Sequence, residues 1–227
     1  MKTMLKQAFI DTIPVLTGYL VLGIGFGILM KTNGYGIWLS FTMSLFIYAG
    51  SMQYVAIGLL AGGASLITIA LTTLMVNARH LFYGISMLHK YQNMGIRKLY
   101  LIFGLTDETY SLVCKDTLPV EEKNKSNYYF LVTLLNHSYW VFGSLLGALI
   151  GSVLPFNSEG IDFALTVLFL TVFLEQWLTS KKHTPALIGV GTSVLCLILF
   201  GQDKFLIPTM LLIALLLCFH KEDYKNA

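Results

Sequence analysis

The chain has 227 residues, of which 56% are hydrophobic and only 12% are charged, and its mean hydropathy is +0.70. Soluble domains carry about 25% charged residues, so this composition indicates a membrane protein. The 15 Lys and Arg residues are spread between the apolar runs and at the chain ends, which argues against nucleic acid as a partner. The three cysteines lack CxxC or Cys/His spacing, so no disulfide framework, metal site or cofactor is predicted.

Apolar segments long enough to cross a membrane recur along the chain. Crossing ~30 Å of hydrocarbon takes about 20 helical residues. The sequence predicts such spans at residues 10–30, 37–60, 66–88, 128–153 and 161–178, with shorter ones at 185–200 and 205–219. The first segment follows lysines, as in a signal peptide, but no small-residue cleavage site comes after it, so it is interpreted as a retained span.

Residues 99–113 form an eighth, ambiguous segment. As a helix they extend about 22 Å, and they carry Asp107 and Glu108. The segment is therefore predicted to be either a short tilted helix or a re-entrant one. The predicted fold is an all-α integral membrane protein, a polytopic helical bundle of 7–8 spans in a single transmembrane domain (1–227).

The distribution of Lys and Arg suggests an orientation in the cell membrane through the positive-inside rule. Eight spans with the N-terminus inside fit this rule moderately. A better fit results when residues 99–113 do not cross and the N-terminus lies outside. Both arrangements place the C-terminus in the cytoplasm, and they leave the side of the N-terminus open.

An internal repeat is suggested by two stretches that align without gaps, LGIGFGILMKTNGYGIWLSFT (22–42) and LGALIGSVLPFNSEGIDFALT (146–166). Both contain glycines spaced for close helix packing. Internal repeats are typical of secondary transporters, in which two halves move around a central site. The sequence thus predicts repeat halves 1–113 and 128–219, either parallel or inverted.

The stretch NARHLFYG (77–84) places a charge inside an apolar segment. Arg79 lies ~13 Å of helix from the end of that segment, near the middle of the membrane. A buried Arg costs at least ~2.5 to 3.5 kcal/mol, which makes it a candidate functional residue. The predicted partners are Asp107 and Glu108 in TDETY. The alternative is a structural ion pair that fixes the packing of the helices.

Three more polar residues, Asn77, His80 and Tyr83, accompany Arg79 as a polar stripe on this helix. A histidine beside carboxylates can carry a proton in a coupled transporter. The alternative for His80 is a neutral imidazole that is hydrogen-bonded within the bundle.

The stretch YAGSMQY (48–54) interrupts another apolar segment with small and polar residues. A helix break here would expose N–H groups whose positive dipole end attracts a carboxylate, and Ser51 and Gln53 can add hydrogen bonds. The alternative is a small-residue packing surface with Gln53 as a link between helices. In LNHSYWVFG, Trp140 is interpreted either as an interfacial anchor or as a pocket residue.

Together with DFALTVLF (162–169), the motifs YAGSMQY, NARHLFYG and TDETY resemble, in this order and spacing, the AzlC/YgaZ family of branched-chain amino acid permeases. The resemblance extends over essentially the whole chain. Tyr54 departs from the family, which often has Phe there, without affecting the chemistry.

The resemblance implies export of leucine, isoleucine, valine and also methionine by a large subunit. It further implies a small AzlD-like membrane partner of about four spans, which is required for activity. The family's substrate ligands are not carried over; the candidate site comes from the chemistry of a zwitterion with an apolar side chain. Arg79, Ser51 and Gln53 are predicted to bind the carboxylate, and Asp107 or Glu108 the ammonium group. Protonation of a carboxylate would then couple transport to a proton gradient.

Three other classes of protein compete with this interpretation. A membrane-embedded enzyme is disfavoured because the chain lacks HExxH, paired Asp and GxSxG motifs. An ion channel or ion transporter would use the same buried Arg, Asp and His residues. A scaffold subunit, whose small partner would contain the transport pathway, is disfavoured by the charged residues within the apolar segments of this chain.

Overall fold

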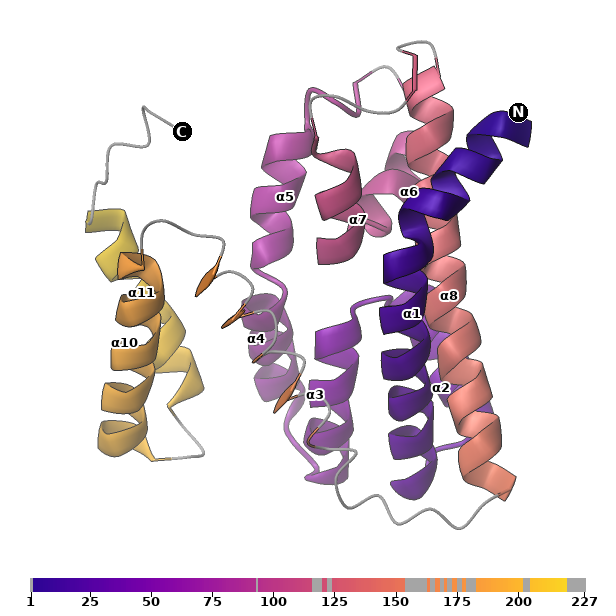
Figure 1. Cartoon of the computed structure of the whole chain (residues 1–227). Coiled ribbons are helices and arrows are strands. Elements are labelled where there is room, and N and C mark those ends of the chain that lie inside the picture. Colours follow the sequence, from indigo (N-terminus) through magenta and orange to yellow (C-terminus); the bar gives the residue numbers. More distant parts are fainter. Residues whose placement is uncertain are drawn as a thin grey trace. The chain divides into compact units, whose positions relative to one another are not determined.

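The structure is a computed structural model that describes residues 2–92, 94–115, 120–121, 124–153, 183–201 and 205–219, together with separate positions between 163 and 178. The described part is helical and contains no β-strand. The chain forms two compact units, residues 1–165 and 166–227. Their helices are α1 (Lys2–Thr32), α2 (Ile37–Phe46), α3 (Gly50–Ala61), α4 (Leu66–Val76), α5 (Arg79–Met87), α6 (Arg97–Phe103), α7 (Asp107–Val113) and α8 (Lys125–Val153) in the first, and α10 (Thr184–Phe200) and α11 (Leu206–Phe219) in the second (Figure 1).

Few of these helices meet the length and hydropathy of a membrane span by themselves. Within the described residues, Met4–Thr32 of α1 does so, and α4 with α5 does so if the pair, bent by 46°, counts as one span. The predicted number of 7–8 spans therefore stays a prediction. The predicted span at residues 161–178 lies largely outside the described residues, as do residues 154–162 of the predicted repeat.

The long helices α1 and α8 pack against each other through their glycines. A Cβ at Gly27 would collide with the carbonyl oxygen of Ser144, and a Cβ at Gly147 would collide with that of Ile24. Only glycine permits such close backbone contact. The predicted role of these glycines in close packing is confirmed at this interface.

The predicted span at residues 37–60 is instead a helical hairpin, α2 and α3. The chain reverses at Tyr48, whose φ of 46° is a left-handed conformation that residues other than glycine rarely adopt. Gln53 Nε2 in α3 donates to Ser44 Oγ in α2 at 3.2 Å, whereas nine residues of straight helix would separate these positions by ~13 Å. The helix break that YAGSMQY suggested is present, but the reversal of the chain was not predicted, because the length and apolarity of residues 37–60 carry no sign of it.

Residues 97–113 form a second hairpin, from α6 and α7. Arg97 Nη1 donates to Asn127 Oδ1 near the start of α8 at 2.6 Å, so α6 begins at that end of the unit. The chain turns between Gly104 and Thr106, and α7 returns beside α5, where the ring of Tyr110 stacks on Tyr83 with centroids 4.6 Å apart. Residues 99–113 are therefore not one helix, and whether they cross the membrane stays a prediction.

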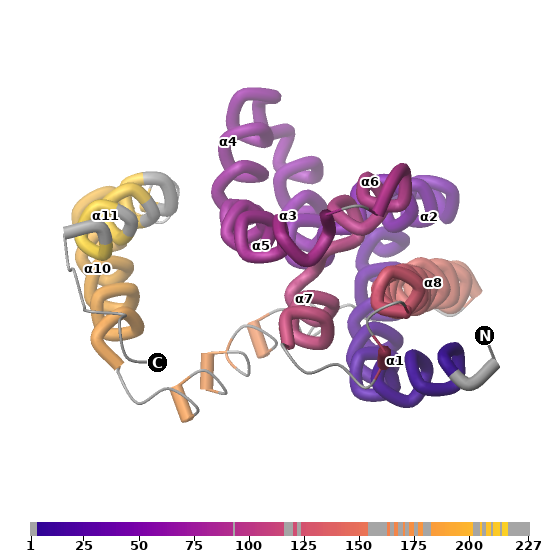
Figure 2. Tube along the Cα trace, turned by 90° about the horizontal axis from the view of Figure 1, so that it is seen from above, coloured from indigo at the N-terminus to yellow at the C-terminus, as the bar shows by residue number. Residues whose placement is uncertain are grey.

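The two hairpins enter the first unit from opposite ends. In Figure 1, α2, α3 and α4 occupy the lower half beside α1 and α8, and α5, α6 and α7 occupy the upper half. Seen from above, the upper helices α5 and α6 project close to the lower helices α3 and α2 (Figure 2). The hairpin turns therefore meet halfway along α1 and α8, at the level where α4 bends into α5.

Candidate functional site

Side chains from three separate motifs meet where the interrupted helices turn. Arg79, the first residue of α5, forms an ion pair through Nη1 with Oδ2 of Asp107, the first residue of α7. Its Nη2 donates a hydrogen bond to Oγ of Ser51 in the first turn of α3 at 2.6 Å. The structure thus brings together three of the residues that the sequence proposes for the site.

The ion pair keeps unused hydrogen-bonding capacity. Arg79 Nε and Asp107 Oδ1 are buried atoms that have no hydrogen-bond partner among the described residues. Yet the two side chains are 34% and 32% exposed, so a ligand can reach them from one side. A free donor beside a free acceptor suits a molecule that carries both a carboxylate and an ammonium group.

Backbone N–H groups add to the donors near Arg79. Helices α3 and α5 begin after Ala49 and Ala78, and neither of these residues offers a side-chain oxygen as a cap. The first hydrogen bond within α3 runs from Gln53 N to Ala49 O at 2.8 Å, so the N–H groups before Gln53 have no intrahelical partner. Such a helix start attracts anions.

An apolar cavity of about 390 Å³ lies where α4 bends into α5; Ala78 and His80, the sequence neighbours of Arg79, line it, but Arg79 itself does not. It is lined chiefly by aliphatic side chains of α4, α5 and α6, and Leu74, Leu81 and Ile102 are among them. Asn77 and His80 stand at the same cavity. The cavity is of the kind that accepts an aliphatic side chain beside a polar group.

The polar residues predicted to accompany Arg79 interact mostly with their near neighbours along the chain. His80 Nδ1 lies 3.1 Å from the carbonyl oxygen of Asn77, and its ring meets Tyr83 edge-on at 5.9 Å. Asn77 caps the end of α4, and its Oδ1 is buried without a hydrogen-bond partner among the described residues. This arrangement favours the hydrogen-bonded alternative for His80.

Gln53 lies apart from the ion pair. Its side chain is fully buried, Nε2 donates to Ser44 Oγ, and Oε1 accepts a hydrogen bond from Trp140 Nε1 at 2.9 Å. Both ends of the amide are therefore used inside the bundle. The geometry favours the alternative interpretation, in which Gln53 links helices, and it places Trp140 in the core.

Glu108 directly follows Asp107 but has different surroundings. Its Oε2 accepts a hydrogen bond from the hydroxyl of Tyr19 in α1 at 2.6 Å. Tyr19 also lies 2.8 Å from Oγ1 of Thr106, the residue that caps α7. The sequence analysis did not identify Tyr19 or Thr106, because a lone Tyr in an apolar helix and a capping Thr carry no signal of a shared network.

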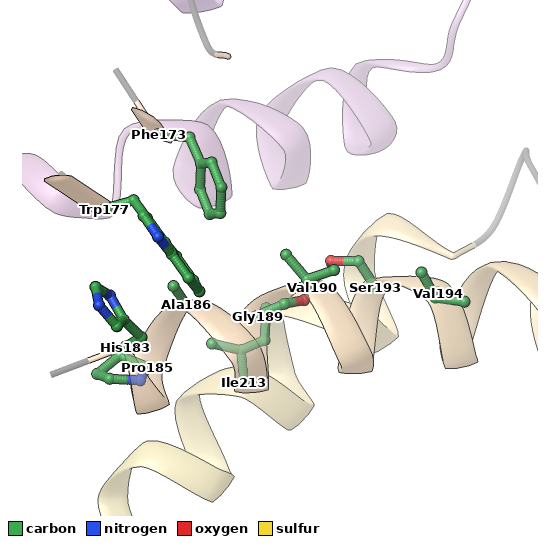
Figure 3. A pocket seen from close by; sticks show the side chains of 10 residues that line it. All are labelled: Phe173, Trp177, His183, Pro185, Ala186, Gly189, Val190, Ser193, Val194 and Ile213. Carbon is green, nitrogen blue, oxygen red and sulfur yellow. Dashed lines mark hydrogen bonds between the residues drawn. The ribbon is translucent and has the colours of Figure 1, made fainter. Parts of the chain in front are cut away.

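The second unit contains a cavity of its own, of about 530 Å³ (Figure 3). Trp177 stacks on His183 with ring centroids 4.1 Å apart, and aliphatic residues of α10, with Ile213 of α11, complete the wall. No charged side chain lines it among the described residues. The cavity contains none of the predicted site residues.

Interrupted helices that converge on a partly exposed ion pair, in an all-helical and apolar chain, define the class of this protein as a helical membrane protein. The chain belongs to the AzlC family: the family described as "AzlC protein" matches residues 14–154. The family resemblance predicted from the motifs is confirmed. The AzlC family is a family of transport proteins and not of enzymes.

Relatives of the chain support the same assignment. It is 47% identical to the branched-chain amino acid transport protein AzlC of Bacillus subtilis, over 98% of this chain and 87% of that protein. It is 42% identical to an uncharacterised membrane protein of Helicobacter pylori, over 96% and 95% of the two chains, and 30% identical to the inner membrane protein YgaZ of Escherichia coli, over 89% and 82%. No solved structure matches the chain. The protein is thus an all-helical membrane protein of an amino acid transport family.

Proposed function

We propose that the chain is the large subunit of a secondary transporter that exports branched-chain amino acids, namely leucine, isoleucine and valine, and also methionine. The observation that carries this proposal is the partly exposed Arg79–Asp107–Ser51 cluster, in which the start of α5 faces the starts of α3 and α7. The name of the Bacillus subtilis relative supports the same substrate class.

The amino acid binds by replacing the internal ion pair. Its carboxylate accepts hydrogen bonds from Arg79, from the Ser51 hydroxyl and from N–H groups at the start of α3, and its ammonium group donates to Asp107. Between turnovers Arg79 and Asp107 pair with each other, so neither charge is left alone in the membrane.

Transport requires a small AzlD-like membrane partner in this proposal, as the family resemblance implies. The test is uptake of radiolabelled leucine into leucine-loaded proteoliposomes that hold the chain with and without this partner. Exchange that needs the partner, and that isoleucine and valine inhibit but lysine and aspartate do not, is the expected result. Ion flux without amino acid exchange would instead favour the ion channel or ion transporter.

The protein is a multi-pass protein with both ends in the cytoplasm in this proposal. The N-terminus, the α5–α6 connection and the start of α8 lie at one end of the first unit (Figure 1), and this end carries Lys6, Lys90, Arg97, Lys98, Lys115 and Lys125. With the two hairpins re-entrant and the three later apolar segments crossing, every Lys and Arg of the sequence except Arg79, Lys31 and Lys204 faces the cytoplasm. The positive-inside rule fits this arrangement better than either arrangement weighed from the sequence.

A further inference from the structure

We propose that Glu108 is the proton-binding carboxylate of the transport cycle, and that its role is separate from that of Asp107. The proposal rests on the proposed function, transport of an amino acid through the Arg79 site. It resolves which of the two adjacent carboxylates pairs with the substrate's ammonium group and which one carries a proton.

The two carboxylates differ in whether a cation balances their charge. Arg79–Asp107 is the ion pair of the described residues, and Glu108 has no cation within salt-bridge distance among them. Its recorded partner is the neutral hydroxyl of Tyr19. A proton that binds to Asp107 must compete with Arg79, whereas a proton that binds to Glu108 removes an unbalanced negative charge from the membrane interior.

Glu108 begins a network of hydroxyl groups that reaches α8. Tyr19 lies between Glu108 Oε2 and Thr106 Oγ1, at 2.6 and 2.8 Å. Thr106 Oγ1 lies 3.1 Å from Thr109 Oγ1, so its single hydroxyl hydrogen can serve either Tyr19 or Thr109, and Asn136 Nδ2 of α8 donates to the same Thr109 oxygen at 3.0 Å. Hydroxyl groups both donate and accept, so such a network can pass a proton along.

Further polar atoms lie beside this network at the turns of the two hairpins. The ring of Tyr48 lies between Tyr19, at 6.5 Å, and His137, at 4.3 Å. His137 Nδ1 lies 3.0 Å from the hydroxyl of Tyr100. The hydroxyl of Tyr48, Oδ1 of Asn136 and Nε2 of His137 belong to buried side chains and form no hydrogen bond of ordinary geometry with the described residues, although the Tyr48 hydroxyl faces Tyr19 and Thr106, and His137 faces the backbone of Ser44 and Leu45.

These polar atoms extend the polar surroundings of Glu108 toward His137. The titratable and charged groups around Glu108 come from every neighbouring element: Tyr19 of α1, Tyr48 of the α2–α3 turn, Arg79 and Tyr83 of α5, Asp107 of α7, and beyond Tyr48 the residues Tyr100 and His137. Arg79 is the cation in this set, and Asp107 already holds it.

Protonation of Glu108 changes the contact between a hairpin and a span. The ionised carboxylate accepts the hydrogen bond of the Tyr19 hydroxyl and so ties α7 to α1. When one proton from the aqueous phase binds, the carboxylate becomes a carboxylic acid that donates a hydrogen bond itself. The acid can still accept the Tyr19 hydrogen bond, but without the negative charge this contact between α7 and α1 is weaker, which links occupancy by a proton to movement of the hairpin that carries Asp107.

The test compares Glu108→Gln with Asp107→Asn in proteoliposomes that also hold the partner. Leucine exchange at equal pH on both sides is measured first, and leucine flux driven by an imposed pH gradient is measured second. We expect folded Glu108→Gln to exchange leucine while its flux no longer responds to the gradient, and Asp107→Asn to lose both activities.

A response of Glu108→Gln to the pH gradient equal to that of the unmodified protein would overturn the proposal. So would loss of exchange by correctly folded Glu108→Gln, because it would place Glu108 in substrate binding. If the unmodified protein exchanges leucine but ignores the gradient, this inference fails while the proposed function stands. Absence of exchange by the unmodified protein would contradict the proposed function itself.

Tyr19→Phe keeps the proposal testable if Glu108→Gln does not fold. Removal of the hydroxyl takes away the hydrogen bond that joins α1 to the Glu108 carboxylate, so the pH at which the gradient response is half-maximal should change. Tyr35→Phe, on a tyrosine with no recorded bond to the network, is the matched control. An unchanged midpoint in Tyr19→Phe would count against Glu108 as the proton site.

Discussion

Arg79 is held by one partner from each of two other elements, Asp107 from α7 and Ser51 from α3. The geometry explains why the charge is retained in the membrane: the guanidinium is neutralised when no substrate is bound, and it still has a free donor in Nε. Lys could not replace it equivalently, because an ammonium group lacks the planar fork that serves two acceptors at once.

Gln53 provides a residue-scale prediction that separates packing from binding. In Gln53→Leu, Trp140 Nε1 loses its buried acceptor and Ser44 loses its donor, which should destabilise the protein by about 1–3 kcal/mol. Thermal unfolding in detergent measures this change, with the exposed Gln92→Leu as the control. The apparent affinity for leucine should stay close to that of the unmodified protein. A large loss of affinity at unchanged stability would return Gln53 to the substrate site.

At the scale of elements, the α1–α8 pair depends on glycines at particular positions. Gly147→Ala forces a Cβ into the backbone of α1 and should cost about 1–3 kcal/mol. Gly18→Ala, on the same α1 helix, meets no described atom within 4 Å and is the matched control. Thermal unfolding of both variants checks the contrast, and equal midpoints would show that this interface is not as close as the structure has it.

The re-entrant hairpins lead to a second prediction at this scale. If α2–α3 turns back, cysteines placed before and after it, Thr32→Cys and Ala64→Cys in a cysteine-free background, lie on the same external side. A membrane-impermeant maleimide should then label both in intact cells, and should label Gln92→Cys only after the membrane is permeabilised. Labelling of just one of the first two positions would mean that residues 37–60 cross the membrane as a single span.

For the whole molecule, the sequence was sufficient to predict the helical class and the family. It also predicted that Arg79 meets Asp107, because a charge in an apolar segment needs an opposite charge. It also indicated the small-residue break near Ser51. The reversal at Tyr48 was not predictable, because a left-handed Tyr leaves no trace in composition. The cavity at the bend between α4 and α5 could not be located either, since its aliphatic lining resembles every other apolar stretch.

The central claim is that the Arg79 cluster binds the carboxylate of a branched-chain amino acid. It is tested most directly by leucine counterflow in proteoliposomes with Arg79→Gln. The control is the exchanged pair, Arg79→Asp with Asp107→Arg, which can restore an ion pair but moves the cation to another helix. We predict that Arg79→Gln abolishes leucine exchange although it folds, and that the exchanged pair recovers stability without recovering exchange. Full exchange by folded Arg79→Gln, or its recovery in the exchanged pair, would contradict the account and make the ion pair structural.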